Sequence, residues 1–424
     1  MAEKIRILFY GDAPNVATGF GTVSRNILVP LHNTGKYDIR ILGINHWGDP
    51  HPFPFPIWPI GVGGKGDPYG RQRASDMMRS DQFPFDILFM IQDSFILEFM
   101  TQVMPHLRQS KKFTSVVYYP VDGVPKSQWI QAMSIFDHPV TYTEFAKQES
   151  ILACPSMANR LQVISHGVNM EDFYPLPDAE VADFKRQFFG KHADKFVITN
   201  VNRNQQRKDI PRTLVAFREF KKRRPNSAIY LHMAAQDQGW NLPEVVRSIG
   251  LQMGEDVLMP GGDFGPNQGY PLPILNFIYN ASDAVVSTTL GEGFGLSTVE
   301  AMACKTPIIF PNNTSLTEII GANEERGYLV PSGATPSDLT ILPNDNEVLR
   351  PLTDVRIFAE KLMEVYDNRD EAKKKTDAAY EWIRSNLQWT KHIAPQWDKL
   401  LTEAVIQMVK SEASGSKVVA AEDL

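Results

Sequence analysis

Two glutamates in one glycine-rich stretch are the residues that first suggest chemistry. Residues 290–307 read LGEGFGLSTVEAMACKTP, with Glu292 and Glu300 eight positions apart. The glycines of this stretch lack a Cβ, so the backbone can approach a ligand closely and present several N–H donors to negative charge, an arrangement that suits a diphosphate. Because phosphate would repel Glu292, we expect Glu292 to accept hydrogen bonds from sugar hydroxyls. Glu300 could then accept from a ribose.

Each glutamate also has a purely structural explanation. Ser297 and Glu300 match the S-x-x-E capping box, in which both side chains only satisfy backbone donors at a helix start. Glu292 could be a solvated loop acid, and a glycine-rich loop is a weak signal alone. On this stretch by itself both alternatives stay open.

A second polar stretch favours the ligand hypothesis. Residues 200–209 read NVNRNQQRKD and follow an apolar run. Arg203 and Lys208 would lie beyond the carboxyl end of that strand and could neutralise a diphosphate leaving group, the arginine as a planar fork and the lysine as a point charge. Both residues are also common where a solvated loop opens a helix, so this stretch gains meaning only together with the two glutamates.

The elements around these loops alternate between short apolar strands and helices. Strands are predicted at residues 5–10, 39–44, 87–91, 114–119 and 140–143, and in a second series at 196–200, 229–233, 257–259, 284–287 and 307–310. Such alternation predicts parallel sheets covered by helices on both faces, with ligands beyond the carboxyl ends of the strands. A glycine loop, Gly19-Phe20-Gly21, follows the first strand and precedes a helix expected near residues 23–31.

A chain of 424 residues exceeds what one hydrophobic core usually supports. Two domains are therefore expected, residues 1–180 with a C-terminal helix at about 388–410, and residues 181–387. We expect a disordered tail at 411–424 and a long surface loop at 332–353. The proline-rich residues 46–59 should form an irregular loop, which is equally well a packed connection or a wall of an acceptor site.

Composition narrows the function classes. Forty-nine acidic against forty-three basic residues give a net charge of −6, which does not favour general binding to nucleic acid or anionic membranes. Cys154 and Cys304 have no spacing typical of a disulfide framework or a zinc site. The N-terminal apolar run is too short for a signal peptide, and no later run reaches the length of a membrane span. We expect a soluble cytoplasmic protein without an integral membrane segment.

The stretch EGFGLSTVEAMACKTPII resembles the E-x7-E segment of the retaining GT-B glycosyltransferases of the large family 4, usually EGFGLPxxEAMAxGxPVI. Further agreement lies in the Gly19–Gly21 loop, in VISHGVNMEDFYP at 163–175, in the Arg203 and Lys208 pair, and in QWTKHIAPQW at 388–397. The resemblance implies two Rossmann-like doubly wound α/β domains facing a central cleft, with the C-terminal helix crossing back to the N-terminal domain.

The resemblance also implies site residues. Arg203 and Lys208 would bind the diphosphate, although their spacing of five, where the family often shows six, leaves Arg207 able to share or take a role. Glu292 would contact the donor sugar and Glu300 the ribose. Further donor contacts would come from Gly19, Phe20, Gly21, Gly293, Phe294, Gly295, Leu296 and, for the base, the main chain of residues 259–263, including Met259 and Gly261.

The implied activity is retaining transfer of a sugar from a UDP- or GDP-sugar to an acceptor hydroxyl, by a front-face mechanism without metal or cofactor. The family's usual histidine is missing, because the N-terminal strand reads VVYYPVDG and Asp122 is its nearest polar residue. Asp122 could orient a substrate or simply cap a turn. Weaker candidates are Asp93, His46 and Trp47 for the acceptor, and His138 and His166, each possibly structural.

Three other functions remain open at this point. One is a nucleotide-sugar-binding module without catalysis, suggested by the missing histidine. Another is a macromolecular acceptor such as modified DNA, suggested by the basic run at residues 218–224, which a solvated helix end explains better. A hydrolase using both glutamates would need their carboxyls about 5–5.5 Å apart and would leave Arg203 and Lys208 without a role. The acceptor could be a small molecule, a glycan, a lipid or a modified nucleic acid.

Overall fold

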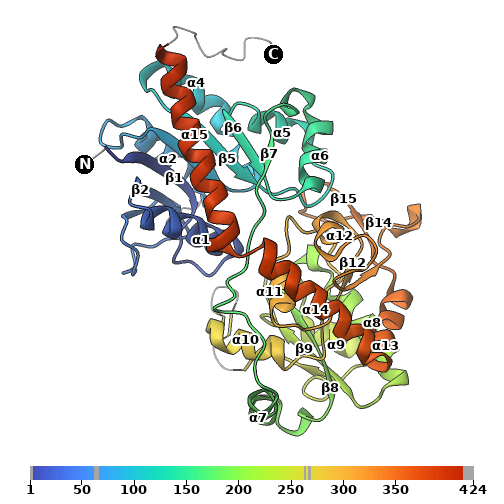
Figure 1. Ribbon diagram of the computed structural model, residues 1–424. Helices are drawn as coiled ribbons and strands as arrows, with labels where there is room; N and C mark the ends of the chain where they lie inside the picture. Colours follow the sequence, from blue (N-terminus) through green and yellow to red (C-terminus); the bar gives the residue numbers. More distant parts are fainter. Residues whose placement is uncertain (1–2, 62–65, 262–263, 266–268, 414–424) are drawn as a thin grey trace. The chain divides into compact units, whose positions relative to one another are not determined.

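The computed structural model describes residues 3–61, 66–261, 264–265 and 269–413. The chain divides into two compact units. The first unit contains residues up to 121, residues 125–166 and the segment from 389 onward; the second contains residues 122–124 and 167–388. Both are built from parallel strands and helices, labelled in Figure 1.

The first unit contains a parallel sheet in the order β3-β2-β1-β4-β5-β6-β7. Its strands are β1 (Ile5–Asp12), β2 (Tyr37–Ile44), β3 (Ile57–Pro59), β4 (Ile87–Ile91), β5 (Thr114–Tyr119), β6 (His138–Thr141) and β7 (Gln162–Val163). Its helices are α1 (Gly19–Asn33), α2 (Arg71–Arg79), α3 (Ser94–Leu97), α4 (Met100–Ser110), α5 (Ser127–Met133), α6 (Glu144–Ala153) and α15 (Ala394–Ala413), with a π-helical turn at Trp389–Ile393. The strands predicted for this half are present; β3 and β7 were not predicted.

The glycine loop expected after β1 is instead the start of a helix. Thr18 is the N-cap of α1, and its hydroxyl accepts a hydrogen bond from the backbone N–H of Gly21 at 2.9 Å. A threonine at this position satisfies an orphan donor of the first turn, so the helix begins at Gly19 rather than near residue 23. The predicted loop is therefore corrected to the first turn of α1.

The C-terminal helix completes the core of the first unit. Side chains alternate across the sheet, so Leu8 and Tyr10 join one core cluster while Phe9 points to the opposite face. On that opposite face the ring of Trp397, from α15, lies 5.0 Å from Phe89 and 4.7 Å from Tyr118. Figure 1 shows α15 in red beside α1 and across the strands of this unit.

The second unit contains a parallel sheet in the order β10-β9-β8-β11-β12-β13. Its strands are β8 (Phe196–Val201), β9 (Ser227–His232), β10 (Val257–Leu258), β11 (Ala284–Val286), β12 (Ile308–Pro311) and β13 (Tyr328–Val330). Its helices are α7 (Asp178–Phe189), α8 (Ile210–Arg223), α9 (Leu242–Ile249), α10 (Leu272–Asn280), α11 (Leu296–Ala303), α12 (Thr314–Ile320), α13 (Val355–Asp367) and α14 (Arg369–Asn386).

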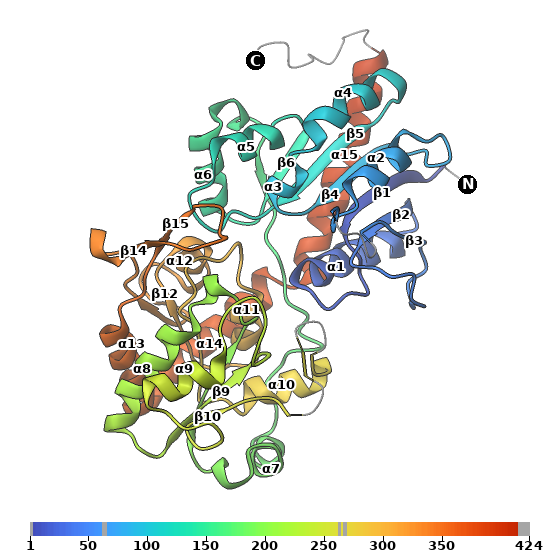
Figure 2. The same ribbon diagram turned by 180° about the vertical axis from the view of Figure 1, so that it is seen from behind.

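Both faces of this second sheet are buried by helices. Ile198 of β8 packs in the core cluster that includes residues of α8, α9 and α13, while its neighbour Val197 packs in the cluster of α7 and α10. Figure 2 shows α8, α9 and α13 together within this unit. The sheet order runs outward from β8 to β9 on one side and from β11 to β12 on the other. The order therefore reverses between β8 and β11, which is where such sheets bind ligands.

The segment predicted as a long surface loop contains a short antiparallel hairpin, β14 (Leu339–Ile341) with β15 (Leu349–Pro351). Each strand has only three residues, which is too short for a periodic pattern to identify it in the sequence. At the other end of the chain, residues 411–413 continue α15, and residues 414–424 lie outside the described residues. No helix among the described residues is long and apolar enough to cross a membrane.

Candidate functional site

The two polar loops singled out in the sequence meet at the switch point of the second sheet. One follows β8 and the other follows β11, and these strands are neighbours. The backbone N–H of Leu290 donates to the carbonyl of Arg207 at 2.8 Å, and the guanidinium of Arg207 donates to the carbonyl of Gly291. The loops that were expected to act on one ligand are thus bonded to each other.

Three charged side chains converge between these loops. The Lys208 ammonium forms an ion pair with Oε1 of Glu292, and Nη1 of Arg207 lies 3.6 Å from Oε2 of the same carboxylate. The side chains of Lys208 and Glu292 are only 11% and 13% exposed. The alternative of a solvated loop acid at Glu292 is therefore wrong.

The charges in this cluster perturb one another. Burial raises the pKa of Glu292, but the charges of Lys208 and Arg207 outweigh burial and hold the pKa below its usual value. Burial lowers the pKa of Lys208, and the carboxylate of Glu292 only partly offsets this. The cluster is a largely buried, charged site in which a second anion, such as a phosphate, can compete for the two cations.

Asp122 belongs to the short 122–124 segment of the second unit and extends the charge cluster. Its carboxylate lies 3.3 Å from Nε of Arg207 and 3.1 Å from Nη1 of Arg350. Burial raises the pKa of Asp122, but Arg207 and Arg350 outweigh it and lower the pKa overall. A Cβ at Gly291 would lie 2.0 Å from the Asp122 carbonyl oxygen, so only glycine fits this approach.

Arg350 was missed by the sequence analysis. It lies on β15, its side chain is 3% exposed, and it also binds Asp345 at 2.6 Å. The surrounding polar, proline-containing segment gave no sign that one arginine would be buried. Only the folded hairpin shows that Arg350 lies between Asp122 and Asp345.

Arg203 lies apart from Lys208. Its guanidinium binds Asp237 through Nε at 3.1 Å and Nη2 at 3.0 Å, and its side chain is 41% exposed. The backbone makes a 3₁₀ turn at Gln206–Lys208, which brings Arg207 rather than Arg203 beside Lys208 and Glu292. Arg207, which the spacing left able to share or take a role, is thus the arginine that lies beside Glu292.

The capping box predicted at Ser297 and Glu300 is not formed. Helix α11 begins at Leu296 with Gly295 as N-cap at φ 97°, and no side chain caps it. Ser297 therefore lies inside the first turn, two positions after the N-cap. Glu300 instead accepts a hydrogen bond at Oε2 from the Tyr279 hydroxyl at 2.7 Å. Burial raises the pKa of Glu300 to about 7.

The loop before α11 is held in place by hydrogen bonds to the first residues of α12. The N–H of Glu292 donates to the Thr314 hydroxyl at 2.9 Å, and the Ser315 hydroxyl donates to the carbonyls of Glu292 and Phe294, both at 2.9 Å. Phe294 is buried. The donor-binding backbone predicted at Gly293, Phe294, Gly295 and Leu296 is thus a fixed loop that leads into an uncapped helix N-terminus, which favours anions.

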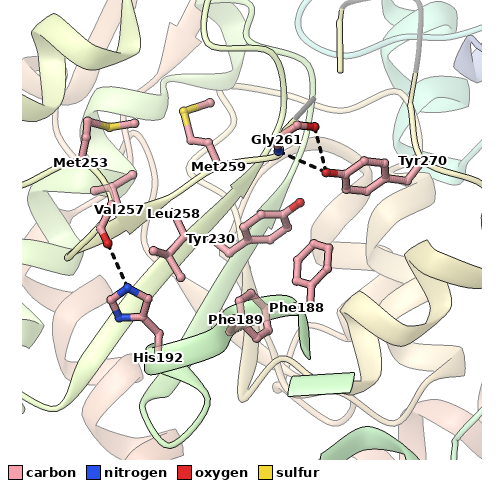
Figure 3. A pocket seen from close by; sticks show the side chains of 11 residues that line it. Phe188, Phe189, His192, Tyr230, Met253, Val257, Leu258, Met259, Gly261 and Tyr270 are labelled. Atoms are coloured by element: carbon pink, nitrogen blue, oxygen red, sulfur yellow. Dashed lines mark hydrogen bonds between the residues drawn. The ribbon is translucent and has the colours of Figure 1, made fainter. Parts of the chain in front are cut away.

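Met259 and Gly261, predicted near the base, line a cavity of about 510 Å³ in the second unit. Figure 3 shows the aromatic side chains around it, including Phe188, Phe189, Tyr230 and Tyr270, together with His192. The Tyr270 hydroxyl contacts the backbone N–H and carbonyl of Gly261 at 3.2 and 3.3 Å. Gly262 and Asp263, the rest of this predicted stretch, lie outside the described residues.

The predicted residues of the first unit sit in several environments. Gly19, Phe20 and Gly21 form the first turn of α1. Asp93 follows β4 as the N-cap of α3, and Trp47 is 62% exposed. His46 is buried, with Nδ1 3.1 Å from the Asn15 amide nitrogen.

Two further histidines of this unit are partly or wholly buried. His166 is buried against Tyr118 and Tyr142, and burial lowers its pKa to about 3. Burial also lowers the pKa of His138. An environment that keeps His166 neutral suits a packed structural histidine.

Sequence reasoning also missed a buried carboxylate at the end of β1. Asp12 accepts hydrogen bonds from the Thr18 hydroxyl at 2.6 Å, the Gln92 amide at 3.1 Å and the Asn45 amide at 3.3 Å. Its partners come from the loops after β1, β2 and β4, so the cluster lies at the carboxyl edge of this sheet. The GD dipeptide after the first apolar run was the available signal.

The basic run at residues 218–224 is neutralised by acids of the same unit. Arg218 and Lys222 bind Glu219, Lys221 binds Asp256, Arg223 binds Glu360 and Arg224 binds Asp367. A cation already paired with a carboxylate contributes little to binding nucleic-acid phosphates. A solvated helix end therefore explains the basic run better than a DNA-binding surface does. Among the described residues, no group of three or more His, Cys, Asp or Glu side chains is placed to hold a metal ion.

Comparisons with known proteins point to one family. Residues 181–342 match the family Glycosyl transferases group 1. Similar curated proteins include the D-inositol 3-phosphate glycosyltransferase of Mycobacteroides abscessus, 28% identical over 176 residues, which is 42% of this chain and 37% of that protein. The O-antigen chain mannosyltransferase B of Escherichia coli is 35% identical over 74 residues, 16% of this chain and 19% of that protein. The match to the first of these proteins thus spans less than half of its length.

Solved structures share the whole fold. Sucrose-phosphate synthase from Thermosynechococcus elongatus aligns with a TM-score of 0.72 at 17% identity, over 95% of this chain and 100% of that chain. Anabaena Alr3699/HepE, solved in complex with UDP and glucose, aligns with a TM-score of 0.66 at 15% identity, over 94% of this chain and 100% of that chain. The two-unit GT-B fold expected from the sequence is confirmed. The part of the chain similar to the family Glycosyl transferases group 1, residues 181–342, includes Arg207, Lys208 and Glu292.

Proposed function

We propose that the protein is a retaining glycosyltransferase that moves a sugar from a nucleotide-diphosphate sugar, UDP- or GDP-linked, to an acceptor hydroxyl. The second unit would bind the donor and the first unit the acceptor. Matches to glycosyltransferases support the general activity, and the UDP complex of a protein with this fold supports a nucleotide-sugar donor.

The observation that carries the proposal is the cluster of Lys208, Arg207 and Glu292 at the switch point of the second sheet. The buried Lys208, the partly buried Arg207 and an uncapped helix N-terminus would make a site for a diphosphate, and the carboxylate of Glu292 could accept from sugar hydroxyls. A hydrolase would leave both cations without a role. Arg203, on the same loop, would exchange Asp237 for phosphate when donor binds.

The chemistry follows from this arrangement. The acceptor oxygen would attack the anomeric carbon on the face from which the diphosphate leaves, forming the new C–O bond as the old one to phosphate breaks. The departing phosphate oxygen takes the acceptor's proton. Lys208 and Arg207 would stabilise the charge that develops on that oxygen, so the positive field comes from the protein itself.

The missing histidine motivates the alternative of a binding module without catalysis. Asp122, the nearest polar residue to that strand end, pairs with Arg207 and Arg350, which suits a role in holding the cations rather than in proton transfer. Free buried thiols at Cys154 and Cys304 support a reducing compartment, and we propose the cytoplasm. The acceptor class is left to experiment.

A coupled nucleotide-release assay tests the proposal. The purified chain is incubated with UDP- and GDP-sugars and a panel of acceptors that includes sugars, polyols, lipids and glucosylatable DNA. Release of nucleotide that depends on an acceptor, with an axial anomeric product by NMR from an axial donor, is expected. Tight binding of UDP or GDP without any turnover would support the binding module instead, and binding of neither nucleotide would overturn both.

A further inference from the structure

The buried hydroxyl of Tyr279 is aimed at a site carboxylate from a neighbouring helix. Tyr279 lies on α10, is 0% exposed, and donates to Oε2 of Glu300 on α11 at 2.7 Å. Its backbone carbonyl accepts from the Thr306 hydroxyl at 2.8 Å, which ties the end of α10 to the segment after α11. Because the Tyr279 side chain is fully buried, its hydroxyl is held in the orientation that donates to Glu300.

The second carboxylate oxygen of Glu300, Oε1, is left to accept from a ligand. Oε1 receives no hydrogen bond from any residue that the structure describes, whereas Oε2 is occupied by Tyr279. A carboxylate with one oxygen anchored inside the protein and one open presents a directed acceptor. Such an acceptor suits a pair of vicinal hydroxyls better than a freely rotating side chain would, because less conformational freedom is lost on binding.

We infer that Tyr279 is a positioning residue, which holds the Glu300 carboxylate in the orientation and the ionised form that the ribose hydroxyls of the donor require. The inference rests on the proposed function. It adds a residue that makes no contact with the donor itself, and it makes donor binding sensitive to pH through one hydrogen bond.

The groups facing Glu300 give the direction of that sensitivity. Burial raises the pKa of Glu300, the hydrogen bond from Tyr279 lowers it, and the charge of Asp172 raises it, with a result of about 7; the Cys304 thiol also lies near. Protonation removes the charged acceptor, so nucleotide affinity should fall as pH drops through about 7. Without the Tyr279 hydroxyl the pKa rises further, and the fall in affinity should begin at a higher pH.

The experiment compares Tyr279→Phe with the wild type for binding UDP and GDP, and their 2′,3′-dideoxy analogues, by calorimetry from pH 5.5 to 9. Tyr328→Phe is the matched control, because Tyr328 is a buried tyrosine of the same unit whose hydroxyl has no hydrogen-bond partner among the described residues. We expect Tyr279→Phe to weaken binding of the better nucleotide about tenfold at pH 7 and to shift the pH midpoint upward. Neither change should occur in Tyr328→Phe.

The dideoxy analogues separate a positioning role from a general structural one. Tyr279→Phe should bind them as the wild type does, because they have no ribose hydroxyls for Glu300 to hold. An equal loss for both kinds of nucleotide, or an unchanged pH midpoint, would overturn the inference. If the wild type discriminates against the dideoxy analogues and Tyr279→Phe changes nothing, the inference fails while the donor site stands. If the wild type binds no nucleotide, the proposed function fails first.

Discussion

Replacing Lys208 with methionine tests the charge cluster most directly. Methionine keeps much of the volume and removes the ammonium that pairs with Glu292. At an effective dielectric of 20, an ammonium about 4 Å from a phosphate contributes at most about 4 kcal/mol. Removing one preorganised donor to developing charge typically lowers kcat about 10²- to 10³-fold. This loss corresponds to about 2.7–4 kcal/mol, which is close to that upper limit. We therefore expect Lys208→Met to lower kcat/KM by about two to three orders of magnitude.

The same substitution should cost little stability. Glu292 keeps Arg207, whose Nη1 lies 3.6 Å from its second oxygen, so the carboxylate is not left unpaired. Loss of one partner of a buried pair costs about 3–5 kcal/mol when the other charge has no substitute, and with Arg207 present we expect about 1–2 kcal/mol. A thermal melt should therefore show a folded variant.

Lys361→Met supplies the matched control. Lys361 lies in the same unit on α13, its side chain is 17% exposed, and its ammonium pairs with Glu324 at 3.0 Å. This variant should lose a similar stability and keep turnover within about twofold. The assay is initial-rate nucleotide release at several donor concentrations. If Lys208→Met retains turnover within about fivefold, or if both variants lose it equally, the assignment of Lys208 to the leaving group is refuted.

Three further outcomes are expected. Glu292→Gln should abolish most turnover yet bind free UDP or GDP as the wild type does, since Glu292 is assigned to the donor sugar; a matching loss of nucleotide affinity in calorimetry would count against that assignment. Glu300 holds a proton in the folded chain up to about pH 7, above its usual 4.5, so the free energy of unfolding should fall as pH rises from 4.5 to 7 and then level off. Glu300→Gln should thus be about 2 kcal/mol more stable than wild type at pH 8 and equal to it near pH 4.5, which urea titrations at both pH values would check. Gly295→Ala places a Cβ at φ 97° and should destabilise by about 1–2 kcal/mol in the same titrations, and an unchanged stability would show that the loop relaxes easily.

The alternation of apolar runs was sufficient to predict most strands of both parallel sheets, because strands buried on both faces are continuous apolar segments such as ILFMI in β4. The short edge strands β3, β7 and β13 were not predicted. The hairpin of β14 and β15 was missed because its strands have only three residues each and form no continuous apolar segment. Among site residues, Glu292 and Lys208 were brought together as the sequence suggested. The buried contacts of Arg350 and Tyr279 were not foreseen, because they depend on packing between segments distant in sequence.

Helix boundaries explain the remaining differences. Ser297 had the right spacing for a capping box, but the positive φ of Gly295 starts α11 two residues earlier than that motif requires. Likewise the side chain of Thr18 starts α1 at Gly19. A shift of one or two residues at a helix start changes which side chains cap and which are free to bind a ligand.

The return of α15 to the first unit has a consequence for how the chain folds during synthesis. The second unit is complete once residue 388 has left the ribosome, whereas the first unit still lacks Trp397, whose ring packs on Phe89 and Tyr118. Nascent chains stalled when residue 388 has just emerged, with the later residues still inside the ribosome, should therefore expose an apolar surface on their N-terminal half while the second unit is already protease-resistant. Maturation of this protein would run from the middle outward, and its earliest-made strands would be the last to become fully packed.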